Sequence, residues 1–250
     1  MRGRQGLMAG DIRDLSGSRF EQVNLAESRI HGAFLIHTKV TDAWVHSLDV
    51  SGNIESLVVN GVEVAGYVQA ELERRHPELG YLDSRDVPGV QRSWAKVQEI
   101  AAATLETALA LPPAALDESV DGEYSYLQTL RHLVFAIDRW ITGPVLGEAA
   151  HFHPLGYPYD SAPPDERAPL DLDANPTLDD VLEVRAGRTG FVDALVRSAS
   201  DESLARVVDS PNGGTTTVGD CIRVVFIEEW WHHRYADRDL AVLAGGGHDS

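Results

Sequence analysis

The stretch Ile-Glu-Glu-Trp-Trp-His-His-Arg, residues 227–234, lies inside a long segment of helical pattern and contains two overlapping Glu-x-x-x-His pairs. Residues four apart share one face of a helix, so Glu228 would lie beside His232 and Glu229 beside His233. A carboxylate and an imidazole one turn apart form half of a metal site. An ordinary solvated patch with a Glu–His ion pair is the alternative that this spacing leaves open.

Three further segments have helical patterns, and the four together predict a bundle. The predicted helices run from about Val90 to Leu111, from Ser125 to Gly143, from Thr177 through Leu195, and from Thr217 to about Leu243. Ser125, Thr177 and Thr217 are each followed three residues later by Gln or Asp, the pattern of a capping box. The Pro-rich stretch 151–176 is long enough to span a helix, so it predicts an up-down-down-up order, and it could also form a wall of the site.

Two faces of the fourth predicted helix compete for the metal. Apolar or aromatic residues continue both of them. They are Cys221, Val225 and Tyr235 on the Glu228 face, and Ile222, Phe226 and Leu240 on the Glu229 face. We favour Glu228 with His232, because that face is directed toward the bundle interior, while Glu229 with His233 fits only slightly worse.

His132, on or beside the apolar stripe of the second predicted helix, is the candidate third ligand. A single histidine in such a place is more often an ordinary core residue. On a helix that faces the fourth one, however, it would complete a set of three side chains with Glu228 and His232.

The histidine on a Ser-capped second helix, together with the ligand-x-x-x-His pair on the fourth, resembles the DinB-like superfamily over residues 88–245. Those proteins are up-down-down-up four-helix bundles whose metal is held by three side chains, usually histidines. Here a glutamate stands where a histidine is usual. In this respect the chain is similar to the branch of mycothiol-dependent maleylpyruvate isomerase, whose metal has a His, Glu, His set of ligands. The resemblance therefore implies a divalent metal at His132, Glu228 and His232, with Zn²⁺ expected first and Ni²⁺, Fe²⁺ or Mn²⁺ also compatible.

The function implied by this resemblance is a metal-dependent S-transferase or isomerase that uses a low-molecular-weight thiol as cosubstrate. His233 and Glu229 are candidate catalytic groups, and in a hydrolase that uses a metal-bound hydroxide either would act as the proton shuttle. Arg234 and Arg238, together with Arg131, are candidates to bind carboxylates of the cosubstrate, and surface arginines paired with Asp237 or Asp239 are the alternative. A metal-dependent hydrolase and a non-catalytic binding or stress-response module, in which the metal only braces the bundle, are the alternatives.

Composition excludes several other classes of protein. The chain of 250 residues has 39 acidic and 21 basic side chains and a net charge of −18, which disfavours nucleic acid as a partner. Its single cysteine, Cys221, allows no intrachain disulfide and fits a reducing compartment. No signal-peptide pattern and no apolar run of roughly 20 residues is present, so we expect a cytoplasmic protein that avoids membranes and acts on a small molecule. Homodimerisation stays open.

A repeat of five residues marks the start of the chain. Every fifth residue is apolar, at Leu15, Phe20, Leu25, Ile30, Leu35, Val40, Val45 and Val50. With Val23-Asn24-Leu25, this pattern resembles a short, degenerate pentapeptide-repeat right-handed β-helix with inward-pointing centres. The predicted organisation is therefore mainly α, with a β segment at 11–57 that caps the bundle, a connector at 58–87 and a DinB-like bundle at 88–250.

Overall fold

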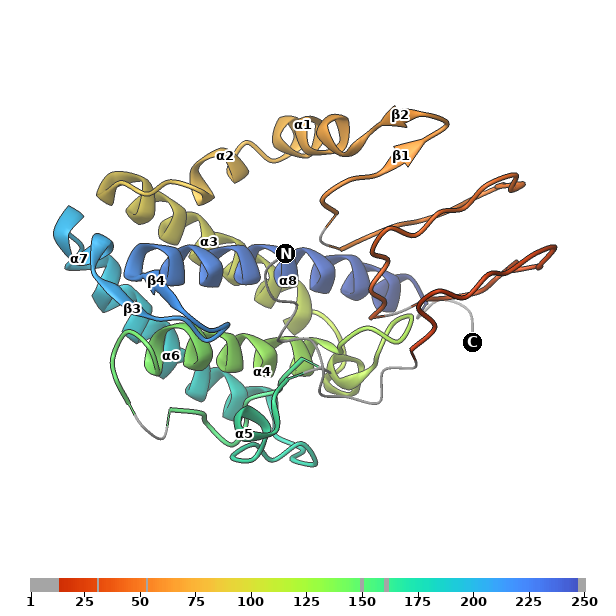
Figure 1. Cartoon of the computed structure of the whole chain (residues 1–250). Helices are drawn as coiled ribbons and strands as arrows, with labels where there is room; N and C mark the ends of the chain where they lie inside the picture. Colours follow the sequence, from red (N-terminus) through yellow and green to blue (C-terminus); the bar gives the residue numbers. More distant parts are fainter. Residues whose placement is uncertain (1–13, 31, 53, 149–150, 160–161, 247–250) are drawn as a thin grey trace.

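A computed structural model describes residues 14–246 apart from 31, 53, 149–150 and 160–161, so parts of the predicted segments (residues 11–13 and 247–250) lie outside the described residues. The protein is mainly helical (Figure 1). The helices are α1 (Ala65–Arg75), α2 (Leu79–Leu82), α3 (Val87–Leu109), α4 (Tyr126–Ile137), α5 (Pro164–Arg167), α6 (Leu178–Arg197), α7 (Asp201–Ala205) and α8 (Val218–Gly246). A 3₁₀ turn covers Pro113–Asp117, and a π-helical turn, Asp138–Thr142, continues α4.

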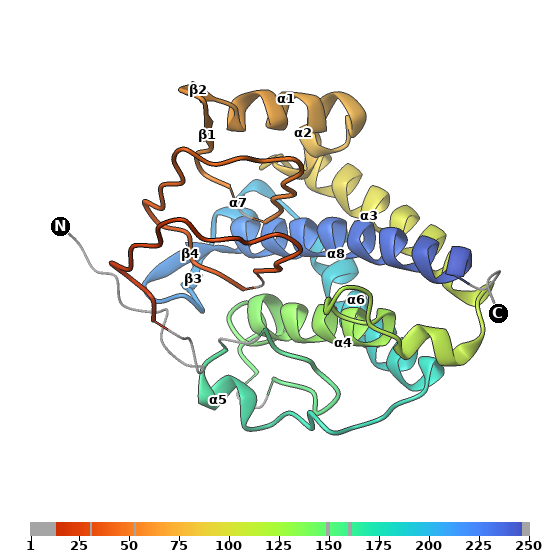
Figure 2. The same ribbon diagram turned by 90° about the vertical axis from the view of Figure 1, so that its right-hand side faces the viewer.

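The four long helices pack on one another (Figures 1 and 2). α8 contacts α3 and α4, and α6 contacts α4 and α3. Every residue of α4 except Gln128 is buried, so this helix is covered on nearly all sides and any polar residue on it needs a partner. None of the helices in the described ranges combines the length and apolar character needed to cross a lipid bilayer.

The predicted starts of three long helices are confirmed by their capping bonds. Ser125 Oγ accepts a hydrogen bond from Gln128 N, and the Gln128 side chain accepts one from Ser125 N. Thr177 and Asp180 exchange the same two bonds at the start of α6. Thr217 Oγ1 accepts a hydrogen bond from the backbone amide of Asp220, 3.1 Å away, at the start of α8. These bonds are local, which explains why the sequence alone predicts them.

The described residues of the segment 14–57 wind in wide loops beside the helices (Figures 1 and 2). The chain turns at intervals of about five residues, but the described residues of this segment contain no strand. The residues expected to point inward, such as Phe20 and Ile30, are exposed, and Trp44 is 98% exposed. The reason is that a repeat buries its centre against neighbours on both sides, and this segment is too short to supply them.

Two hairpins complete the fold. β1 (Val58–Val59) pairs antiparallel with β2 (Val62–Glu63), and β3 (Val207–Asp209) pairs antiparallel with β4 (Thr215–Thr217). The second hairpin leads directly into α8, and the amide of Val218 donates to the carbonyl oxygen of Arg206, 3.0 Å away. This bond joins the first residue of α8 to the chain that precedes the hairpin.

Candidate metal centre

Three potential ligands from two helices converge in the structure. His132 comes from α4, and Glu228 and His232 come from one face of α8. One donor atom from each lies within 4.8 Å of the other two. The Glu228 Oε2 atom is 3.2 Å from His232 Nε2 and 3.7 Å from His132 Nε2. The His132 side chain is buried, while that of Glu228 is 35% exposed, so the group has an inner and an outer side.

The long loop after α4 orients His132. The Nδ1 atom of His132 is 3.0 Å from the carbonyl oxygen of Tyr157. A carbonyl only accepts, so Nδ1 carries the proton in the neutral ring and Nε2 presents a lone pair toward Glu228. With the ring neutral, two electron donors then face each other across 3.7 Å, and either a proton on Nε2 or a metal cation between them would satisfy both. The donor set therefore fits a bound metal ion.

Arg131 fastens this loop to α4. Its guanidinium donates to the carbonyl oxygens of Leu155, Asp171 and Ala174, at 2.9, 2.7 and 2.9 Å. Its own carbonyl accepts from the Tyr157 amide, 3.1 Å away. Arg131 was expected among the groups that bind the cosubstrate. The structure instead places it as the anchor of the segment that holds His132.

Electrostatics favour the state that binds a cation. Burial would raise the pKa of Glu228, but its contacts with His132 and His232 outweigh burial and lower the pKa below the usual range. Burial lowers the pKa of His232, and the contact with Glu228 opposes this only in part. Glu228 is thus ionised and His232 neutral near pH 7, as metal ligation requires.

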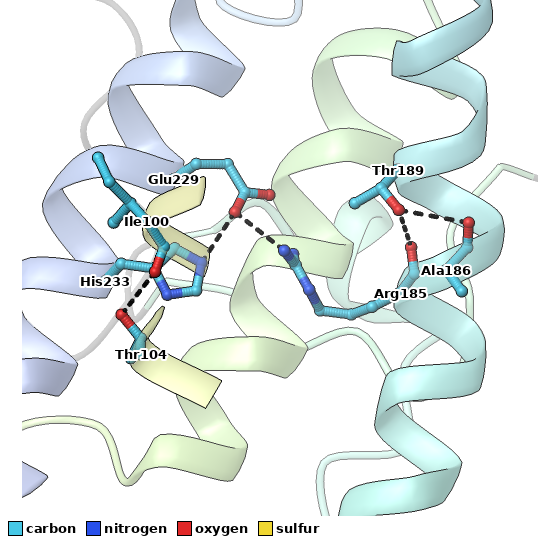
Figure 3. Close-up of polar contacts among 7 residues, drawn as sticks. All are labelled: Ile100, Thr104, Arg185, Ala186, Thr189, Glu229 and His233. Atoms are coloured by element: carbon cyan, nitrogen blue, oxygen red, sulfur yellow. Dashed lines mark hydrogen bonds and ion pairs between the residues drawn. The ribbon is translucent and has the colours of Figure 1, made fainter. Parts of the chain in front are cut away.

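The second acid–histidine pair of α8 lies in the core (Figure 3). Glu229 and His233 are 0% and 1% exposed, and His233 Nε2 is 3.2 Å from Glu229 Oε2. Arg185 of α6 donates to the same carboxylate oxygen from 2.9 Å. Burial would raise the pKa of Glu229, but the Arg185 charge and the His233 hydrogen bond hold it at about 2. The two groups expected to be catalytic are therefore enclosed, and the Glu229 carboxylate is shared between His233 and the Arg185 guanidinium.

The two arginines expected to bind a cosubstrate already contact neighbours. Arg234 Nη1 lies 2.7 Å from His76 Nε2, and its guanidinium is 4.8 Å from the centre of the Trp230 ring. Arg238 donates to Asp239 from 2.7 Å. Neither contact involves the three candidate ligands.

Aromatic rings that were not predicted from the sequence as part of the candidate centre border it. The Tyr124 ring lies 5.4 Å from the His132 ring and is stacked at 6.4 Å from that of His232. Tyr235 meets His232 edge to face at 6.2 Å. The only sequence signal for Tyr235 was its place on the Glu228 face of the helix, and Tyr124 had none beyond preceding the Ser125 cap.

The fold and the site together define a class of protein: a helical protein in which two packed helices bring three candidate metal ligands together. The family model described as DinB superfamily matches residues 96–236, more than half of the chain and a range that includes all three ligand candidates. The chain belongs to the DinB superfamily. Comparison with curated proteins and with solved structures gave no match.

Proposed function

We propose that the protein binds one divalent metal ion through His132, Glu228 and His232. The observation that carries this proposal is the approach of three ligand atoms from two helices to within 4.8 Å of one another. Two imidazoles and a carboxylate suit Zn²⁺ first, and Ni²⁺, Fe²⁺ or Mn²⁺ as alternatives. The proposal includes an up-down-down-up order for α3, α4, α6 and α8, as in the resemblance to DinB-like proteins.

We further propose that the protein is a metal-dependent S-transferase or isomerase with a low-molecular-weight thiol of the mycothiol type as cosubstrate. A divalent ion with three protein ligands keeps an open position and lowers the pKa of a thiol or water placed there. The Tyr157 carbonyl holds His132 in one tautomer, and α8 presents the other two ligands one turn apart. The exposed side of Glu228 is where a cosubstrate would approach.

A second candidate function is a binding module in which the metal braces α4 against α8. The contacts of Arg234 with His76 and of Arg238 with Asp239 favour it, because they engage the two side chains that the thiol hypothesis assigns to the cosubstrate. In this case the ion would stabilise the fold without turning over a substrate.

The first experiment is metal content by mass spectrometry on wild type, His132→Ala and His46→Ala. His46 is exposed and lies in the N-terminal loops, so it serves as the matched histidine control. We expect about one ion per chain in wild type and in His46→Ala, and none in His132→Ala. Stoichiometric metal in His132→Ala, or none in wild type, would contradict the metal site.

The second experiment separates the functions. The metal-loaded protein is incubated with biological thiols and a panel of electrophiles, and thiol consumption is followed with and without a chelator. Chelator-sensitive consumption supports the transferase or isomerase. Ester or amide hydrolysis without thiol indicates a hydrolase, and stabilisation by metal without either reaction supports the binding module.

A further inference from the structure

The segment Glu-Glu-Trp-Trp-His-His, residues 228–233, has each residue type at two adjacent positions. Adjacent residues lie about 100° apart around an α-helix and about 1.5 Å apart along it. A rotation of α8 by that angle with that shift would bring Glu229 and His233 to the places of Glu228 and His232. The local sequence therefore does not determine which acid–histidine pair faces His132.

A contact from another helix distinguishes the two pairs. Arg185 of α6 and His233 both bind the same oxygen of Glu229, at 2.9 and 3.2 Å (Figure 3). All three side chains are buried. Because α6 also packs against α4, which carries His132, the contact orients α8 relative to the helix that supplies the third ligand.

The buried polar contacts among Arg185, Glu229 and His233 contribute little to the stability of the fold. Arg185 Nη1, Glu229 Oε1 and His233 Nδ1 are buried and have no hydrogen-bond partner among the described residues. Each unpaired buried polar atom costs about 1–3 kcal/mol. Replacing a buried ion pair by apolar side chains of similar size is often neutral or stabilising. Buried polar contacts with this cost are better explained if they select one orientation of the helices. Single polar residues in coiled-coil cores have this role.

We propose that Arg185, Glu229 and His233 form a register lock, a set of positioning residues that turns Glu228 and His232 toward His132. The use of the lock for metal binding rests on the proposed function above, whereas the orientation of α8 does not. Apolar residues on the buried face of α8, such as Ile222 and Phe226, also resist rotation. Without the lock, these apolar contacts alone do not fix the orientation of α8.

The first test replaces the lock and leaves the ligands unchanged, in the variant Arg185→Met/Glu229→Leu/His233→Leu. We expect a folded protein by circular dichroism, with Zn²⁺ affinity reduced at least about tenfold and a changed visible spectrum of the Co²⁺-loaded form, which reports ligand geometry. Arg185→Lys, which keeps the charge, should retain most of the affinity. A folded triple variant with wild-type affinity and Co²⁺ spectrum would overturn the proposal.

The second test needs no metal. Native protein is treated with diethylpyrocarbonate, and modified histidines are mapped by mass spectrometry. In wild type we expect His232 to react and His233 to be protected, since their side chains are 19% and 1% exposed, with exposed His46 reactive throughout. In Arg185→Met/Glu229→Leu, His233 should become reactive and His232 less so.

A third variant covers the case in which these substitutions prevent folding. Glu229→Gln keeps the shape of the side chain and removes its charge, and the reactivities of His232 and His233 should then converge. An unchanged footprint in a folded lock variant would overturn the proposal. If wild type binds no metal, the proposed function fails, and the footprint still decides whether the lock orients α8.

Discussion

Two acid–histidine pairs on α8 have the same residue types and the same spacing, but the structure gives them opposite surroundings. Glu228 and His232 lie at a half-open surface and meet His132 of α4. Glu229 and His233 lie in the core and meet Arg185 of α6. The facing helix therefore decides what each pair can do. An imidazole adds a third ligand for a cation, whereas a guanidinium already supplies the positive charge that the carboxylate needs.

The largest expected effect breaks the buried pair. Arg185→Met leaves the Glu229 carboxylate buried without its cation, so the free energy of unfolding should fall by about 3–5 kcal/mol in a guanidinium titration. Adding Glu229→Leu should restore part of the loss. Glu228→Leu in metal-free protein is the matched control and should change stability by less than about 1 kcal/mol, since the Glu228 side chain is 35% exposed. A loss in Glu228→Leu as large as that in Arg185→Met would contradict the difference between the pairs.

The next effect concerns the half-open pair. If it binds metal, free Zn²⁺ at 100 times its dissociation constant should stabilise the fold by about 2.7 kcal/mol, measured as a rise in the thermal midpoint. His132→Ala should abolish the rise, and a chelator should reverse it in wild type. A rise of the same size in His132→Ala would place the ion elsewhere.

The smallest effect tests how far the Glu228 face of α8 remains open. Cys221 continues this face toward the start of α8, where it is fully buried. Burial raises the pKa of its thiol to about 11, so the thiol stays neutral at pH 7.5 and ionises only as the pH approaches that value. Alkylation of native protein at pH 7.5 should be slow, and unfolded protein should react quickly. Fast native alkylation would show that this face opens along its whole length.

Local signals could be read from the sequence, and contacts between distant residues could not. The caps at Ser125, Thr177 and Thr217 depend on residues three positions away, so three helix starts were predicted. The β3–β4 hairpin was missed, although β-branched residues flank the turn sequence Ser-Pro-Asn-Gly-Gly, residues 210–214. That pattern is typical of a β-hairpin, but it is short and lies between two long helical patterns.

The candidate site shows the same limit. Spacing alone selected the residues of both pairs. The preference for Glu228 rested on its face pointing into the bundle, and that reason was wrong, because the fully buried face carries Glu229 and His233 with Arg185 of α6 against them. In residues 14–57 the five-residue period was visible, yet the period does not tell whether enough repeats stack to bury side chains such as Phe20.

The most direct test of the central claim is a calorimetric Zn²⁺ titration of Glu228→Gln against Glu229→Gln, with wild type alongside. We expect Glu228→Gln to lose at least about 100-fold in affinity, whereas Glu229→Gln, which changes a positioning residue and no ligand, should lose about tenfold. The reverse order would assign the metal to the buried pair, and a wild type that binds no Zn²⁺ would contradict the metal centre itself.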